Sequence, residues 1–350
     1  MNVYTTDKIR NVVLLGHGGC GKTSLVEAMA YLAGVTSRMG KVADGNTISD
    51  YGKEEQKRQI SITTSVVPIE WEGVKINLLD TPGFFDFVGE VEEAVSAADA
   101  AIIVVSGKAG VEVGTEKAWE LCEKYKLPRF IFVTDMDIDN ASFRQVVEDM
   151  TEKYGKKLAP FHLPVREDEK FVGYINVITE QAYRWKDKEV IECEMPEYSK
   201  PNLQICRDAL MEAVAETSEE FMERYFNGEA FSEAEIRASL RNNVMEGSIV
   251  PMSMGSSLLC QGIYTLLDDI VKYMPSPENR EMAGINLKTN EIFAANFDFS
   301  KPKSAYIFKT IVDPFIGKYS LIKVCSGVFK SDDLIFNEEK DIEEKISKLY

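Results

Sequence analysis

Histidine and closely spaced cysteine are almost missing from this chain of 350 residues. It contains two histidines, His17 and His162, and its six cysteines are scattered, with no C-x-x-C pair. Because structural zinc sites are built from closely spaced cysteines and histidines, a zinc site is not expected. Isolated cysteines are typical of proteins in a reducing compartment, so we expect a cytoplasmic protein.

The sequence also lacks a long apolar run. No stretch reaches the roughly 18 residues that identify a membrane-spanning helix. Residues 1–8 lack the apolar core of a secretory signal. We therefore expect no membrane partner.

Positive charge is in deficit. The 40 lysines and arginines face 57 aspartates and glutamates, which gives a net charge of −17. Free nucleic acid is bound chiefly by cations that neutralise phosphates, so this balance weighs against free DNA as a partner but leaves a local basic contact with RNA open. The remaining composition is 45% apolar, which is that of a globular protein, and the length predicts two or more domains.

One motif dominates the sequence. Residues 16–23 match the phosphate-binding pattern G-x-x-x-x-G-K-[ST] at every fixed position, between an apolar run at Val12–Leu15 and an amphipathic helical pattern. The glycines let backbone N–H groups surround phosphate oxygens, Lys22 can reach the β- and γ-phosphates, and Thr23 offers a hydroxyl to magnesium. The predicted phosphate loop comprises Gly16, His17, Gly18, Gly19, Cys20, Gly21, Lys22 and Thr23.

Short apolar runs alternate with helical patterns from residue 11 to about 154. This alternation predicts an α/β fold, a P-loop NTPase domain with a mostly parallel sheet whose ligands lie at the carboxyl ends of the strands. Residues 35–62 are polar and rich in glycine, and we expect a structureless, functional or mobile stretch there. Strands are expected at Val12–Leu15, Thr64–Ile69, Lys75–Leu79, Ala101–Val105 and Arg129–Val133, and helices at Lys22–Ala33, Val88–Ala97, Gly114–Tyr125 and Ser142–Tyr154.

The rest of the chain does not continue this alternation of strand and helix patterns. Residues 156–248 predict an inserted α+β subdomain, for which an acidic decoration without a partner is the simplest interpretation. Residues from Ser304 onward predict strands separated by turns, too few to close a sheet. We therefore predict a nucleotide-binding domain over 1–275, a linker over 276–302, and an incomplete β-barrel domain over 303–350, within a longer protein. The expected pieces are strands at Phe161–Val165, Phe171–Val177, Ala182–Trp185, Ser304–Val312, Ser320–Cys325 and Leu334–Asn337, and helices at Gln204–Ala215 and Ser232–Asn242.

Two further segments complete the expected phosphate site. One follows the strand Lys75–Leu79, where a P-loop NTPase carries its second metal-side carboxylate. Asp80 would hold magnesium through water, and the Gly83 N–H would meet the γ-phosphate. The other segment ends at Ser61, whose hydroxyl would complete the magnesium shell; alone, each segment is also an ordinary turn or strand entry. The first segment consists of Asp80, Thr81, Pro82 and Gly83.

Two loops are expected to hold the base. In the segment Thr134–Asp137, the Asp137 carboxylate can accept hydrogen bonds from N1–H and N2–H₂ of guanine, donors that adenine lacks. Backbone N–H groups of the later loop would meet guanine O6. That loop consists of Gly255, Ser256 and Ser257.

Together these segments resemble translation elongation factor G and, more broadly, the translational GTPases. The resemblance covers essentially the whole chain and includes Arg58–Ile62, Tyr273–Pro277, Asp313–Lys318 and Ser326–Ser331. The insertion resembles the extra subdomain that separates elongation factor G from elongation factor Tu. The resemblance implies a domain that binds GTP and GDP with Mg²⁺ and acts on the ribosome.

Several positions depart from the family pattern. Where the family has the histidine of D-T-P-G-H, which positions the attacking water, this chain has Phe84. Of the two positions that the resemblance implies in catalysis, this chain keeps Lys22 but has Phe84 in place of the histidine, so we expect impaired catalysis. Loss of a group that positions water or carries a proton typically costs about 10²–10⁴ in rate.

The other departures affect the phosphate loop and the base. Gly19 replaces an aspartate, and Gln59 stands beside Ser61 as a candidate to position water instead. Thr134 and Asp135 replace the Asn-Lys of N-K-x-D, although the Thr134 hydroxyl is expected to donate to guanine N7. We expect intact phosphate and magnesium binding, with weakened hydrolysis and base selection.

Three functions remain open. The first is a slow, ribosome-dependent GTPase that drives a step such as translocation or resembles the ribosomal-protection factors for tetracycline. The second is a nucleotide-binding module that docks to the ribosome with little hydrolysis, which Phe84 and Asp135 favour. The third is a P-loop enzyme with relaxed base choice that uses ATP, against which Asp137 argues.

Overall fold

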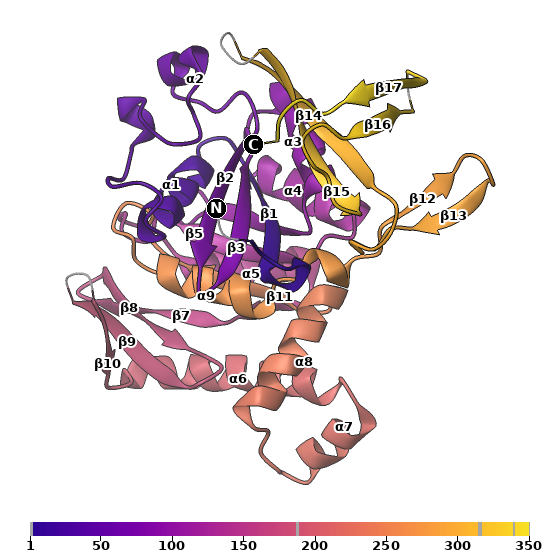
Figure 1. Ribbon diagram of the computed structural model, residues 1–350. Coiled ribbons are helices and arrows are strands. Elements are labelled where there is room, and N and C mark those ends of the chain that lie inside the picture. Colours follow the sequence, from indigo (N-terminus) through magenta and orange to yellow (C-terminus); the bar gives the residue numbers. More distant parts are fainter. Residues whose placement is uncertain (1–2, 187–188, 314–316, 339, 350) are drawn as a thin grey trace. The chain divides into compact units, whose positions relative to one another are not determined.

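The computed structural model describes residues 3–186, 189–313, 317–338 and 340–349. The chain divides into two compact units, Met1–Ser276 and Pro277–Tyr350 (Figure 1). The first unit is built on a seven-stranded sheet of order β2-β3-β1-β4-β5-β11-β6. Its strands are β1 (Ile9–Gly16), β2 (Ser65–Trp71), β3 (Val74–Asp80), β4 (Ala100–Ser106), β5 (Arg129–Thr134), β6 (Leu158–Pro160) and β11 (Val250–Met254).

The burial of each strand explains its place in this sheet. β4 and β5 are buried along their whole length and lie in the middle, where continuous apolar sequence is typical of a parallel sheet covered on both faces. β2 alternates buried and exposed side chains and pairs antiparallel with β3 at the edge. All the other pairings are parallel, so the predicted mostly parallel α/β sheet is confirmed.

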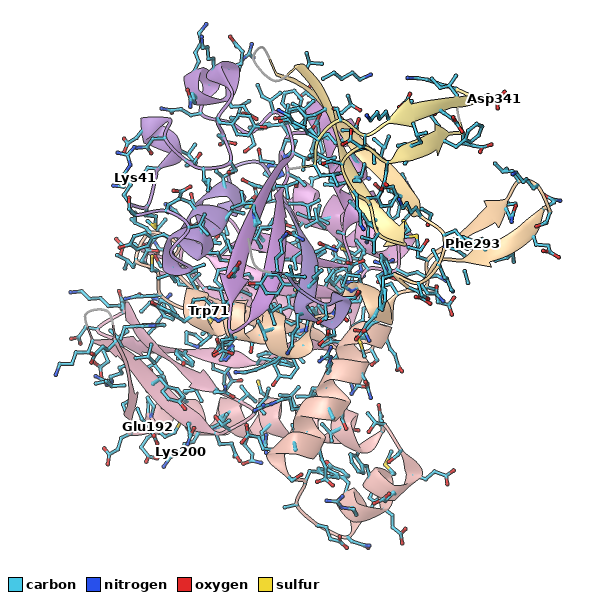
Figure 2. The ribbon with its side chains drawn as sticks, viewed as in Figure 1. Lys41, Trp71, Glu192, Lys200, Phe293 and Asp341 are labelled. Atoms are coloured by element: carbon cyan, nitrogen blue, oxygen red, sulfur yellow. The ribbon has the colours of Figure 1, made fainter. Side chains whose placement is uncertain are left out.

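Helices cover both faces of this sheet. α1 and α9 pack against each other and against β2, whereas α3 and α4 contact β1 from the other face (Figure 1). Trp71, at the end of β2, fixes α9 in place, because its indole N–H donates to Asp268 Oδ1 at 2.9 Å (Figure 2). The helices of the sheet are α1 (Lys22–Leu32), α3 (Val88–Ala97), α4 (Val113–Lys124), α5 (Phe143–Tyr154) and α9 (Ile263–Tyr273).

The inserted subdomain leaves the sheet after β6 and returns to it at β11. Its antiparallel sheet has the order β10-β9-β8-β7, and three helices follow. β10 and α7 were not predicted: both are short, and every β10 residue except Cys193 is exposed, so little apolar periodicity marks that strand. The elements are β7 (His162–Glu167), β8 (Lys170–Asn176), β9 (Gln181–Lys186), β10 (Glu189–Cys193), α6 (Lys200–Ala215), α7 (Glu219–Phe226) and α8 (Glu233–Glu246).

The expectation that residues 35–62 are structureless is wrong. They contain the helix α2 (Lys53–Arg58), and two buried glutamates hold them to the domain. Glu27 accepts hydrogen bonds from the backbone N–H groups of residues 40 and 48, both at 2.7 Å. Glu55 accepts from the N–H groups of residues 62 and 63, both at 3.0 Å. Carboxylate anchors of this kind leave no apolar pattern in the sequence.

The second unit consists of small antiparallel pairs in the described residues. β14 (Ser304–Asp313) pairs with β15 (Gly317–Ser326), and β16 (Leu334–Asn337) pairs with β17 (Ile342–Lys345). The segment expected as a linker carries a further hairpin of β12 (Ala283–Asn286) and β13 (Glu291–Ala294). Residues 314–316 of the family-like segment lie outside the described residues, and the barrel remains a prediction.

None of the helices in the described part of the chain combines the length and the apolar character that crossing a bilayer requires.

A buried ionisable pair joins β7 to α9. His162 Nδ1 lies 3.5 Å from Asp269 Oδ2, and the two residues are 3% and 6% exposed. Burial raises the pKa of Asp269 to about 8 and lowers the pKa of His162 to about 3. The charge of Lys272 opposes the shift of Asp269 and adds to that of His162, and the charge of Asp268 adds to the shift of Asp269. Both side chains are therefore uncharged at neutral pH.

Asp269 is expected to make the protein less stable as the pH rises from 6.5 to 8. Its folded pKa lies above the unfolded value, so its contribution is complete below about pH 4 and is lost as the pH approaches 8. His162 acts in the opposite sense, but only below pH 6.5. In urea titrations, the unfolding free energy of the wild type should fall relative to that of Asp269→Asn by up to about 1.4 kcal/mol per pH unit. Equal pH dependence of the two proteins in this window would contradict the neutral pair.

Candidate functional site

The phosphate loop connects β1 to α1, as the motif predicts. β1 ends at Gly16, and Gly21 is the N-cap of α1, with φ of 93°. Gly16 and Gly19 also have positive φ, 145° and 86°, a region that side chains other than glycine rarely enter. The sequence therefore places glycine at the three positions where the turn requires it.

Lys22 lies inside this loop. The residue is only 5% exposed, and Nζ donates hydrogen bonds to Gly16 O at 3.0 Å and His17 O at 2.8 Å. Cys20 is buried beside it, with Sγ 3.8 Å from Nζ, and burial raises the pKa of its thiol. The ammonium group thus sits at the centre of the loop, where it can meet phosphate oxygens.

His17 turns its side chain away from the loop, toward α4. Its Nδ1 accepts a hydrogen bond from the Gly114 N–H at 3.2 Å, and Nε2 lies 3.6 Å from Glu112 Oε1. A Cβ on Gly114 would lie 2.4 Å from the Cα of His17, so the two backbones touch. The imidazole therefore holds the phosphate loop against α4, and only the backbone N–H of His17 can donate to a phosphate.

Hydroxyl and carboxylate oxygens gather beside Lys22. Thr23 Oγ1 lies 3.0 Å from Ser61 Oγ. Asp80 is buried, and one of its oxygens accepts from Ser49 Oγ at 2.6 Å. The other, Oδ1, has no hydrogen-bond partner among the described residues. Burial raises the pKa of Asp80.

Asp50 belongs to the same cluster, which the sequence alone did not indicate. It is buried, and burial together with the charge of Asp80 raises its pKa to about 6. No group of three or more His, Cys, Asp or Glu side chains in the described residues could hold a metal ion. The mixture of hydroxyls and two carboxylates, one of which has an orphaned oxygen, nevertheless fits magnesium, which prefers oxygen ligands and keeps several waters.

Phe84 extends over the phosphate loop. A Cβ on Gly18 would lie 3.1 Å from Cζ of this ring, and the side chain remains 44% exposed. Gly83 approaches even more closely, because a Cβ there would lie 2.5 Å from Lys22 Nζ. Gln59, considered as a substitute for the missing histidine, donates instead to Ala43 O at 2.9 Å, on the exposed side of α2.

The expectation that Thr134 donates to guanine N7 does not fit the geometry. Its hydroxyl is buried and bonds to Cys20 O at 2.8 Å, with Val105 O at 3.3 Å. A hydroxyl has one hydrogen to donate, and both neighbours are acceptors. Thr134 therefore holds the phosphate loop through its hydrogen bond to Cys20 O, a role that no local sequence signal reveals.

Thr134→Val is expected to weaken GDP binding about tenfold, since a buried carbonyl left unpaired costs about 1–3 kcal/mol. The loss should be the same for 7-deaza-GDP, which lacks N7, and Thr134→Ser should bind like the wild type. Calorimetric titration of the three proteins measures this. If Thr134→Val weakened the binding of GDP but not that of 7-deaza-GDP, the Thr134 hydroxyl would contact guanine N7 and our interpretation would be wrong.

The two base loops meet each other. The Met136 N–H donates to Gly255 O at 3.2 Å. Asp135 adopts φ of 62° and accepts from Ser106 Oγ at 2.7 Å, and burial raises its pKa. Asp137 is exposed and free to face a ligand edge, whereas Ser257 Oγ is buried with no hydrogen-bond partner in the described residues. The structure thus brings together four of the five segments that the sequence singled out, at the carboxyl ends of β1, β3, β5 and β11, and Ser61 of the fifth segment lies beside Thr23.

Comparison with known proteins agrees with this arrangement. Residues 7–276 match the family described as "Elongation factor Tu GTP binding domain". Elongation factor G from Chlamydia trachomatis serovar D and from serovar A are each 35% identical over 357 residues, which cover 99% of this chain and 51% of the relative. A crystal structure from Thermus thermophilus has a TM-score of 0.85 and 34% identity, covering 97% of this chain and 48% of that one.

The chain spans about half the length of the curated relatives that it matches. The family match extends over most of the chain, including every segment of the candidate site. The chain therefore belongs to the elongation factor Tu GTP-binding domain family, as a translational GTPase domain related to elongation factor G.

Proposed function

We propose that this chain binds GTP and GDP with magnesium and serves as the nucleotide-dependent part of a cytoplasmic factor that acts on the ribosome. The observation that carries the proposal is a series of contacts that joins the phosphate loop of Lys22 to three other loops. A Cβ on Gly83 would lie 2.5 Å from the Lys22 ammonium nitrogen, Thr134 bonds to the loop that contains Lys22, and Gly255 bonds to the segment that follows Thr134. The relatives named elongation factor G support a ribosomal step such as translocation.

The residues divide the work by chemistry. Lys22 and the backbone N–H groups of the loop bind the β- and γ-phosphates, and Asp137 binds the N1–H and N2–H₂ edge of guanine. Thr23 and Ser61 would hold magnesium directly, and Asp80 through water. Magnesium, when bound, neutralises charge that develops on the phosphates.

Phe84 favours a second version of this function, in which GTP is bound and hydrolysed slowly. A phenyl ring cannot take a proton from water or orient it by a hydrogen bond. A factor that holds GTP and docks to the ribosome, or one that resembles the ribosomal-protection factors, fits this residue equally well.

Calorimetric titration with GDP, GTP and ATP in the presence of magnesium tests the proposal. Tight binding of both guanine nucleotides, with ATP at least about a hundredfold weaker, is expected from the Asp137 contact. Equal binding of ATP would mean that Thr134 and Asp135 have removed base selection. Absence of binding to all three would refute the function.

Phosphate release with and without ribosomes separates the two versions. Stimulation by ribosomes supports a working GTPase, and a rate that ribosomes leave unchanged supports a nucleotide-binding module.

A further inference from the structure

Gly18 differs from the other glycines of the phosphate loop. Gly16, Gly19 and Gly21 have positive φ and are required by the turn, but Gly18 has an ordinary backbone conformation that any residue adopts. Glycine is therefore needed at position 18 because there is no room for a side chain, and not because of the backbone conformation.

The space beside Gly18 is filled by one side chain. The three atoms nearest to a Cβ at this position are Cζ, Cε2 and Cε1 of Phe84, at 3.1, 3.2 and 3.3 Å. These distances are shorter than an ordinary van der Waals contact, so a methyl group would press on the tip of the ring. Gly18 and Phe84 are thus matched in size.

The neighbouring residue shows which end of the loop the ring covers. Gly83 also has no positive φ, and a Cβ on it would lie 2.5 Å from Lys22 Nζ and 2.7 Å from Gly18 Cα. Lys22 is the group that reaches the β- and γ-phosphates. The segment that carries Phe84 therefore lies against the end of the loop where a terminal phosphate binds.

We propose that Gly18 and Phe84 form an apolar cover over the terminal phosphate, which slows both the release of a bound triphosphate and the approach of water to it. The proposal rests on the proposed function, since it requires a nucleotide in the loop. Removing water strengthens the charge-assisted hydrogen bonds beneath the ring. The cover gives the Phe84 substitution a role of its own, retention of GTP, in addition to the loss of a water-orienting group.

A double-mutant cycle on nucleotide release tests this cover. Release of a fluorescent, non-hydrolysable GTP analogue is measured for the wild type, Gly18→Ala, Phe84→Ala and the double variant. Each single change is expected to speed release about tenfold, because the first displaces the ring and the second removes it. The double variant should be no faster than either single variant, which is a coupling of about 1.4 kcal/mol.

The same cycle with GDP provides the internal control, because GDP has no γ-phosphate. Its release should change less than threefold in all variants. Val88→Ala, which truncates another exposed apolar side chain of the same segment, should release both nucleotides like the wild type. A hundredfold effect in the double variant, or equal effects on GDP, would overturn the cover.

A fluorescence measurement keeps the test independent of how the Gly18 variant folds. In Phe84→Trp, indole emission should shift when the GTP analogue binds but not when GDP binds, after subtraction of the wild-type signal. No shift with either bound nucleotide would also overturn the cover. A wild-type protein that binds neither nucleotide would refute the proposed function itself, and the cover with it.

Discussion

Lys22→Ala is expected to weaken binding of GTP and GDP by about a hundredfold to a thousandfold. The ammonium group is a charged donor to the phosphate oxygens of both nucleotides, and charge-assisted hydrogen bonds are worth about 1.5–3 kcal/mol each. The loop holds this group in place, because Nζ donates to two of the loop carbonyls, and a methyl group cannot replace either bond. Calorimetric titration with magnesium present measures the effect.

Lys41→Ala is the matched control for this prediction. Lys41 is exposed, lies in the stretch before α2 and takes no part in the site (Figure 2). It should bind both nucleotides like the wild type. Thermal unfolding of both variants separates lost binding from lost folding, and normal GTP affinity in a folded Lys22→Ala protein would refute the phosphate-loop assignment.

Phe84→His is expected to raise ribosome-stimulated hydrolysis by about 10²-fold or more, since a positioned proton-carrying group typically contributes about 10²–10⁴ in rate. The half-exposed ring has solvent on one side, so an imidazole fits there without repacking the core. Phosphate release in single turnover, with ribosomes in excess, measures the gain.

Phe84→Leu separates the imidazole from mere loss of the ring. It removes the aromatic cover but adds no proton carrier, so its hydrolysis rate should stay within about tenfold of the wild type. If both variants gain equally, water access alone limits the wild type. If neither gains, residues outside this segment set the rate.

The parts of the site that sequence predicts well are those defined by local spacing. Gly16–Thr23 and Asp80–Gly83 follow strands β1 and β3, whose predicted and observed bounds differ by a few residues. A motif of this kind depends on neighbours in the chain, and the strand before it is apolar throughout. The roles of these residues toward a nucleotide remain predictions.

The parts that sequence missed depend on partners far apart in the chain. Ser49 meets Asp80 across 31 positions, and Thr134 meets Cys20 across 114. Glu27 looks like one more charge on a helix until its carboxylate is seen to hold residues 40 and 48. Such hydrogen bonds carry no periodicity, so only the folded chain reveals them.

The place of β11 has a consequence for the order in which the chain can fold. β11 lies between β5 and β6, and Leu158 of β6 has its sheet partner, Val250, only about 90 residues later. At roughly 5–20 residues per second, a ribosome needs about 5–20 s to make the intervening chain. During that time β5 has an open edge and β6 has no neighbour in the sheet. The loop that follows β11 is therefore the last segment of the candidate site to be synthesised, and a nascent chain acquires the loop that we propose contacts guanine only after the inserted subdomain has been made.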